Sequence, residues 1–215
     1  TFTRQIDRLP LPVSSTPGFL VNRILMPYLM EAVVLESEGI PATIIDKAAV
    51  DFGMPMGPVE LADTVGLDIC LHVAEILAEH FNATIPERLR KLVDAGKLGK
   101  KSGQGFYPYK KGKAVKPKAS ASKGDIEAVT NRLMLRMLNE AVSCLREQVV
   151  SSDSLLDAGM IFGTGFAPFR GGPMHYIDAT GADKLKQTLI GLEQQQGNRF
   201  TPDPAWDTAS GGDKT

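Results

Sequence analysis

The amino-acid sequence predicts an all-α protein made of two tandem helical repeats packed against each other. Segment 22–32 recurs 109 positions later (131 − 22) as segment 131–141, and both contain Asn-Arg followed by Glu-Ala. Segment 54–66 recurs 115 positions later (169 − 54) as segment 169–181, with Gly-Pro, Asp and Gly in matching places. Apolar residues follow a helical period, and no stretch shows the alternation of a strand. We therefore expect two copies of one folding unit, each covering the apolar face of the other.

Composition excludes several classes of protein. The chain has 215 residues, 43% of them hydrophobic, and a net charge of −1, which favours neither nucleic-acid binding nor membrane-surface binding. No run of ~18 apolar residues predicts a membrane span, and the N-terminus lacks the apolar core of a signal peptide. We expect a protein of the cytoplasm or of an organelle matrix. Cys70 and Cys144 lie in apolar helical stretches, which predicts reduced core residues.

The first repeat is expected over residues 16–110, after a linker at residues 1–15. Thr16 is placed to cap a long helix that has Pro17 in its first turn and ends at Gly39. Pro27 lies inside this pattern, and it should kink the helix or move its start toward Asn22. Further helices are predicted over 42–52, from Val59 onward, over 67–81 and over 86–95. Two glycines and two prolines within 53–58 predict a fixed turn between the second and third helices.

The second repeat is expected over residues 124–197, after a connector of Lys, Ala, Ser and Pro at 111–123. Asp125 is a candidate cap for a helix that runs to about Val150. Two more helices are predicted over 153–162 and 182–195. The tail, 198–215, contains two prolines and a Gly-Gly pair, and we expect it to be loose.

Neither glycine-rich segment predicts a nucleotide site. The segment 163–168 begins like a dinucleotide fingerprint, but Pro168 stands where the third glycine belongs, and a helix precedes it instead of a strand. The segment 103–107 fails for the same reason. No group of His, Cys, Asp and Glu has metal-ligand spacing, and no Ser or Cys has a nucleophile motif. We therefore expect no catalytic, cofactor-binding or metal-binding residue in this chain.

His72 and His80 are expected at the core edge or in solvent. His72 and His80 lie eight positions apart on one predicted helix, and His175 replaces Glu60 at the matching place of the second copy. Because two equivalent units would need different chemistry at that one place, this substitution argues against a shared catalytic role.

Asn22 is the polar residue with two open interpretations. It lies in the first turns of an apolar helix, where its amide either faces a cleft and holds a substrate oxygen or ties the helix start to a neighbouring loop. The repeat of Asn22-Arg23 as Asn131-Arg132 favours the structural interpretation when spacing alone is considered.

Several motifs in order resemble a known family. The segments 16–23 (TPGFLVNR), 53–68 (GMPMGPVELADTVGLD) and 99–107 (GKKSGQGFY) resemble the C-terminal domain of L-3-hydroxyacyl-CoA dehydrogenase. The segment 162–173 (FGTGFAPFRGGP) resembles the duplicated C-terminal domain found in the alpha subunit of multifunctional fatty-acid oxidation complexes. The resemblance implies two repeats of the 6-phosphogluconate dehydrogenase C-terminal-like fold, packed as a pseudo-dimer.

The resemblance also implies a function shared with sequence outside this chain. In the family an upstream Rossmann domain binds NAD and carries a catalytic histidine with its glutamate partner, and acyl-CoA lies between the domains. Asn22 matches the asparagine that faces the substrate and this histidine, so the expected substrate-binding residues are Asn22, Pro55, Met56 and Gly57, with Asn131 as a structural echo. The chain looks as if it starts at the linker that follows the Rossmann domain.

These implications predict partners and leave alternatives. NAD should be bound by the Rossmann domain, and the isolated chain should be inactive. Expected partners are that domain, acyl-CoA, a hydratase/isomerase domain and a thiolase subunit, without nucleic acid or a membrane span. The alternatives are a non-catalytic helical scaffold that kept the fold, or a relative with the same fold acting on another hydroxy acid.

Overall fold

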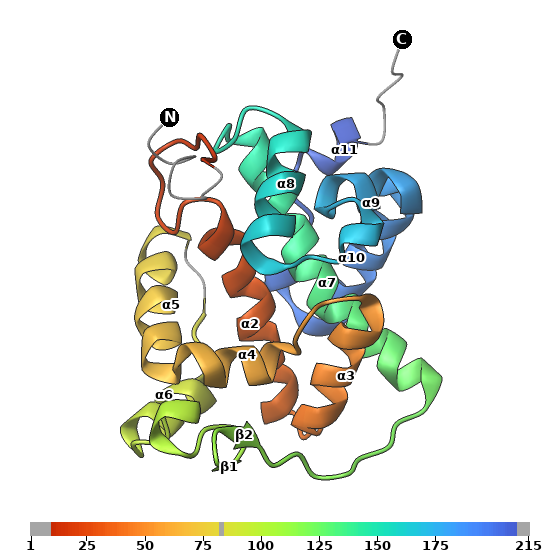
Figure 1. Cartoon of the computed structure of the whole chain (residues 1–215). Coiled ribbons are helices and arrows are strands. Elements are labelled where there is room, and N and C mark those ends of the chain that lie inside the picture. Colours follow the sequence, from red (N-terminus) through yellow and green to blue (C-terminus); the bar gives the residue numbers. More distant parts are fainter. Residues whose placement is uncertain (1–9, 82–83, 210–215) are drawn as a thin grey trace.

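Helices dominate the structure, a computed structural model that describes residues 10–81 and 84–209 (Figure 1). In this part of the chain the only strands are β1 (Tyr109–Lys110) and β2 (Lys113–Ala114), which form one short antiparallel hairpin. The hairpin was not predicted, because two-residue strands are too short to show an alternating pattern. None of the described helices is long and apolar enough to cross a membrane. The all-α prediction is confirmed.

The first copy consists of five helices, as predicted. They are α2 (Val21–Ser37), α3 (Ala42–Phe52), α4 (Pro58–Val65), α5 (Leu67–Phe81) and α6 (Glu87–Asp94). The predicted start of the first helix is wrong. Gly18 and Phe19 have φ angles of 75° and 50°, which are left-handed, so a helix capped at Thr16 cannot pass through them. Pro27 was expected to kink the helix or to move its start toward Asn22. The helix starts at Val21, next to Asn22, and Pro27 lies inside it.

The second copy repeats the order of the first. Its helices are α7 (Lys123–Arg146), α8 (Asp153–Thr164), α9 (Pro173–Thr180), α10 (Ala182–Gln196) and α11 (Trp206–Ala209). The cap of α7 is Ser122, not Asp125, whose carboxylate instead closes a capping box with Ser122. The helix α7 also ends before Val150, and Gln148 there has a left-handed φ of 55°. The sequence prediction missed α9, although the repeat of α4 implied it.

The expectation of a loose tail is wrong for residues 198–209. The side chains of Phe200 and Trp206 are both 0% exposed, because they pack into the main core. The Asn139 amide on α7 holds this segment through the Thr201 carbonyl at 3.0 Å and the Trp206 indole N–H at 2.8 Å. The burial of two aromatic rings thus holds the segment against the core.

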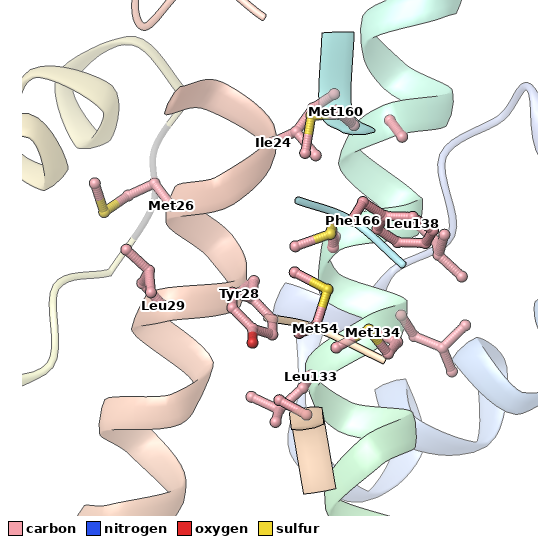
Figure 2. Packing of buried hydrophobic residues seen from close by; sticks show 14 of the residues in the cluster. Ile24, Met26, Tyr28, Leu29, Met54, Leu133, Met134, Leu138, Met160 and Phe166 are labelled. Atoms are coloured by element: carbon pink, nitrogen blue, oxygen red, sulfur yellow. The ribbon is translucent and has the colours of Figure 1, made fainter. Parts of the chain in front are cut away.

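The two copies pack through α2 and α7, which lie side by side in the middle of the molecule (Figure 1). Figure 2 shows Ile24 and Tyr28 of α2 gathered with Leu133, Met134 and Leu138 of α7 in one continuous core. α3 also packs against α7, and α8 against α2. Cys70 and Cys144 are buried and free, as predicted.

Ion pairs cross this central contact in both directions. The Arg23 guanidinium lies 2.6 Å from a Glu140 carboxylate oxygen and 2.7 Å from one of Glu147. Arg132 lies 2.6 Å from Glu31 and 2.6 Å from Glu38. Both arginines are buried, and every partner belongs to the other copy. The copies therefore pair as the subunits of a two-fold dimer do.

Candidate functional site

The first turn of α2 presents Asn22 to solvent and buries Arg23 beside it. Asn22 has no side-chain hydrogen bond with any described residue, and neither does the half-buried Asn131. Of Asn22 and Arg23, only Arg23 forms ion pairs that cross to the second copy. The structural interpretation of the Asn-Arg pair therefore holds for the arginine, and the Asn22 amide keeps its donors and acceptor for another partner.

Asp46 of α3 fixes the turn at 53–58. One Asp46 carboxylate oxygen accepts the Val59 N–H at 2.9 Å at the start of α4. Because Asp46 is so close, a Cβ atom on Gly57 would overlap its carboxylate, so only glycine fits. In the second copy Asp157 accepts the Met174 N–H at 2.7 Å in the same way. This duplicated carboxylate positions the turn and is structural.

Asp63 fixes the glycine-rich loop that follows α6. Its carboxylate accepts the backbone N–H groups of Phe106 and Tyr107, each at 2.9 Å. Burial raises the pKa of Asp63, and these N–H groups oppose the rise because they stabilise the ionised form. Gly99 and Gly105 lack the Cβ atoms that would overlap Asp63. The glycines of this motif therefore serve close packing.

Asn22 and the 53–58 turn border the same segment of the second copy. Val21, beside Asn22, has a methyl carbon 2.9 Å from the place where a Gly163 Cβ would lie. Pro55 has a ring carbon 2.7 Å from the corresponding place at Gly165. Pro55 is exposed, Met56 is half-buried and Gly57 is buried. The end of α8 thus lies between the predicted site residues, a contribution that the sequence prediction did not include.

Three aromatic side chains are exposed around this segment. Phe19 is 59% exposed before α2, Phe162 is 73% exposed in the last turn of α8, and Phe169 is 75% exposed beside Gly53. We call Phe19, Asn22, Pro55, Phe162 and Phe169 the α8-end surface. Exposed apolar groups of this size mark surfaces that contact another molecule or domain.

The glycine-rich turns do not fit the pyrophosphate of a dinucleotide. The Gly165 N–H donates to the Ile161 carbonyl at 2.9 Å, and the Phe166 N–H donates to that of Met160 at 3.3 Å. In the other loop the Gly105 N–H donates to the Tyr107 carbonyl at 3.0 Å. Amides that are already bonded cannot cradle phosphate oxygens.

The described residues hold no group of His, Cys, Asp and Glu suited to a metal ion. His72, His80 and His175 are all exposed and lie on α5 and α9, and for His72 and His80 this agrees with the solvent interpretation. The His80 ring lies 2.8 Å from the Ile76 carbonyl of its own helix and beside the Phe81 ring. These positions give the histidines no shared catalytic arrangement.

Sequence reasoning did not identify the crossed ion pairs of Arg23 and Arg132. The signal was present, because the glutamates at 31 and 38 recur at 140 and 147, the same 109 positions later (140 − 31). A charged residue repeated in both copies at a buried place needs a repeated partner. Comparing the charges of the two copies would therefore have found the pairing.

Comparison with known proteins assigns a relationship to most of the chain. The family described as "3-hydroxyacyl-CoA dehydrogenase, C-terminal domain" matches residues 18–109 and again 129–210. The fatty acid oxidation complex subunit alpha of Shewanella putrefaciens is 43% identical over 94% of this chain, which spans 30% of that subunit. The subunit of the same name from Shewanella baltica is 42% identical, with 94% and 30% covered.

Solved structures share the fold. A 3-hydroxybutyryl-CoA dehydrogenase from Escherichia coli superposes with a TM-score of 0.81 and 22% identity, over 97% of this chain and 63% of that one. The dehydrogenase part of multifunctional enzyme 1 from Caenorhabditis elegans gives a TM-score of 0.68 and 22% identity, over 96% and 51%. At this identity the likeness concerns the arrangement of helices.

Proposed function

Because the chain belongs to the family of 3-hydroxyacyl-CoA dehydrogenase C-terminal domains, we propose that it forms the substrate side of an NAD-dependent L-3-hydroxyacyl-CoA dehydrogenase of fatty-acid β-oxidation. The observation that carries the proposal is the exposed, unpartnered Asn22 beside a buried Arg23, at the start of α2, which lies within the first of the two family matches. An amide so placed can bind a polar group of a substrate or of a neighbouring domain.

The four site residues have different tasks in this proposal. Asn22 hydrogen-bonds the substrate or orients the catalytic group that acts on it, and Pro55 and Met56 contact the acyl-CoA from the neighbouring turn. Gly57 allows that turn to pack on Asp46. Asn131 contacts no substrate in this proposal, because it belongs to the second copy and is half-buried.

NAD and the catalytic histidine-glutamate pair belong, in this proposal, to a separate NAD-binding domain. The bonded amides of this chain's glycine-rich turns support that division. The α8-end surface is the face that such a domain covers, since its exposed rings need an apolar partner. The isolated chain should therefore bind no NAD and oxidise no 3-hydroxyacyl-CoA.

The wider assembly follows from the relatives. The chain spans about 30% of the length of the alpha subunits that it matches, so further domains are expected in the complete protein. We propose a hydratase/isomerase domain and a thiolase subunit among the partners, and the bacterial cytoplasm as the compartment. The division into repeats at 16–110 and 124–197, with a connector at 111–123, remains part of this proposal.

A chimera tests the proposal. This chain replaces the matched segment of the Shewanella putrefaciens alpha subunit, and NADH formation from 3-hydroxybutyryl-CoA is followed by absorbance. We expect turnover by the chimera and none by the purified chain. NADH formation by the chain alone would contradict the division of tasks. A folded chimera that binds NAD without turnover would indicate a non-catalytic scaffold.

A further inference from the structure

A cleft of about 730 Å³ lies between the two copies, and no residue of the α8-end surface lines it. It is lined by α2 and α5 of the first copy and by α7 and segment 196–201 of the second. None of the four predicted site residues lines it. Its volume is within the usual range for small-molecule sites, ~300–1,000 Å³.

The two walls of the cleft differ in chemistry. The wall from the first copy is mainly apolar, with Met26, Pro27, Met30, Leu77, Phe81 and Ile85. The wall from the second copy is polar, with Arg136, Asn139, Gln196, Asn198, Arg199 and Thr201. A molecule that fits both walls must itself have an apolar part and a polar part.

The difference arises where the repeats have diverged. Pro27 and Arg136 are equivalent positions, as are Met30 and Asn139, each pair 109 residues apart (136 − 27). Both members of each pair line this cleft, so it lies across the pseudo-two-fold axis. Two identical copies would give it two identical walls. Divergence at these positions has placed apolar Pro27 and Met30 on one wall and polar Arg136 and Asn139 on the other.

Of the three arginines that line the cleft, Arg136 is the one without a carboxylate partner among the described residues. Arg23 binds Glu140 and Arg199 binds Glu31, so the acidic groups in the cleft are already paired. Arg136 donates through Nη1 to the Arg199 carbonyl, and its Nε has no hydrogen-bond partner in the described chain.

A buried guanidinium without a charged partner favours the binding of an anion. Burial lowers the pKa of Arg136, and the charges of Glu31 and Glu140 oppose that effect only through space. Removing a guanidinium from water costs free energy unless a charged partner replaces the lost hydration. A carboxylate accepts charge-assisted hydrogen bonds from the fork of an arginine. Asn139 is not such a partner, because it already holds Thr201, Asp203 and Trp206.

We propose that this cleft binds an alkyl carboxylate, with the carboxylate group on Arg136 and the alkyl chain along Met26, Met30 and Leu77. The ligand class is a fatty-acid anion of medium length, whose two ends match the two walls. This site is separate from the residues proposed for substrate binding, because none of Asn22, Pro55, Met56 and Gly57 lines the cleft.

Titration of decanoate into the intact chain tests the site, below the concentration at which decanoate forms micelles. Calorimetry and Trp206 fluorescence report binding, since the Trp206 indole bonds to Asn139 in the cleft wall. We expect saturable binding of one decanoate per chain, at least ten-fold tighter than 1-decanol or acetate. Equal affinity for 1-decanol, or no saturation by decanoate, would overturn the proposal.

Variants locate the site. Arg136→Met should weaken decanoate binding at least ten-fold, whereas Arg90→Met should not, because Arg90 pairs with Glu75 on the surface outside the cleft. Asn22→Ala should leave decanoate binding unchanged, and loss of binding in that variant would place the ligand elsewhere and overturn the proposal. If Arg136→Met fails to fold by circular dichroism, the comparison of decanoate with 1-decanol on the unchanged chain decides.

Discussion

Arg23 and Arg132 occupy equivalent positions in the two copies, and each crosses to two carboxylates, one within and one directly after the helix that carries the other arginine. Their partners are equivalent as well, since Glu31 and Glu38 match Glu140 and Glu147 after the same 109 positions (147 − 38). The pattern is that of an isologous interface, in which each contact occurs twice. A duplicated chain thus carries its dimer partner at high effective concentration.

Loss of one crossed arginine should destabilise the chain strongly. In Arg23→Met, two carboxylates remain beside a side chain that is only 3% exposed in the native protein. Breaking a buried pair from one side costs about 3 kcal/mol of unfolding free energy. Urea denaturation measures the loss, and Arg132→Met should resemble it. Lys47→Met removes an exposed pair and should cost less than about 1 kcal/mol, so equal losses would contradict the assignment.

Arg23 should also make the unfolding free energy depend on pH. The hydrogen bond from Arg23 lowers the pKa of Glu147 below its ordinary value of 4.5, despite some burial. A carboxylate with a lowered folded pKa contributes stability that is complete above its unfolded pKa and is lost as the pH falls through the folded one. Unfolding free energies measured from pH 6 to pH 3 should therefore converge between the native chain and Arg23→Met. Parallel curves would show that Glu147 is not coupled to Arg23.

Alanine at Gly57 or Gly172 should disturb both turns, with an added backbone strain at Gly172, whose φ is 107°. A Cβ atom at either place would overlap an aspartate, Asp46 or Asp157, that caps the following helix. We expect each substitution to cost about 2–3 kcal/mol, as overpacking in a core does. Gly191→Ala is the matched control, because nothing lies within 4 Å of its added Cβ and a helix gains about 0.5–1 kcal/mol from alanine. Thermal denaturation in which all three behave alike would contradict the role of the aspartates.

Trp206→Ala tests whether residues 198–209 belong to the core. The indole ring is 0% exposed, so its removal should cost about 3–5 kcal/mol. Asp207→Ala is the neighbouring control, since Asp207 is exposed and pairs only with Lys186. Chemical denaturation of the two variants compares them. A small loss in Trp206→Ala would restore the expectation of a loose tail.

Local patterns predicted the helices well where one strong signal marked each boundary. The spans 42–52 and 67–81 agree with α3 and α5. Gly53 ends α3 and Gly66 precedes α5, and both glycines have a positive φ. The start of α2 was misplaced because Thr16-Pro17 is a good cap by composition, whereas Phe19 has a positive φ that ends any helix begun there. Such a conformation has no signal in the residue itself.

The candidate site was predictable in part. Asn22 and the 53–58 turn came from the family motif, and the structure leaves Asn22 exposed. The approach of Gly163 and Gly165 to Val21 and Pro55 joins residues more than a hundred positions apart, and only the packing of α8 brings them together. The cleft at Arg136 was not predicted for the same reason, since its two walls come from different copies.

Asn22 and Asn131 give the sharpest comparison, because one substitution can be made at two equivalent positions. Asn22 is exposed and Asn131 is half-buried, and neither amide bonds to a described side chain or backbone group. Asn22→Ala and Asn131→Ala should therefore each change the unfolding free energy by less than about 0.5 kcal/mol. In the chimera, Asn22→Ala should lower kcat/KM at least ten-fold while Asn131→Ala leaves it unchanged.

The kinetic pattern distinguishes contact with substrate from a structural effect. An amide that stabilises the reacting state lowers kcat and kcat/KM together, whereas an amide that only binds substrate raises KM. Either pattern confined to Asn22 supports its place at the acyl-CoA surface. Equal kinetic effects at both positions would mean that the repeated asparagine serves the architecture of the two copies, and Asn22 would then have no special role in substrate binding.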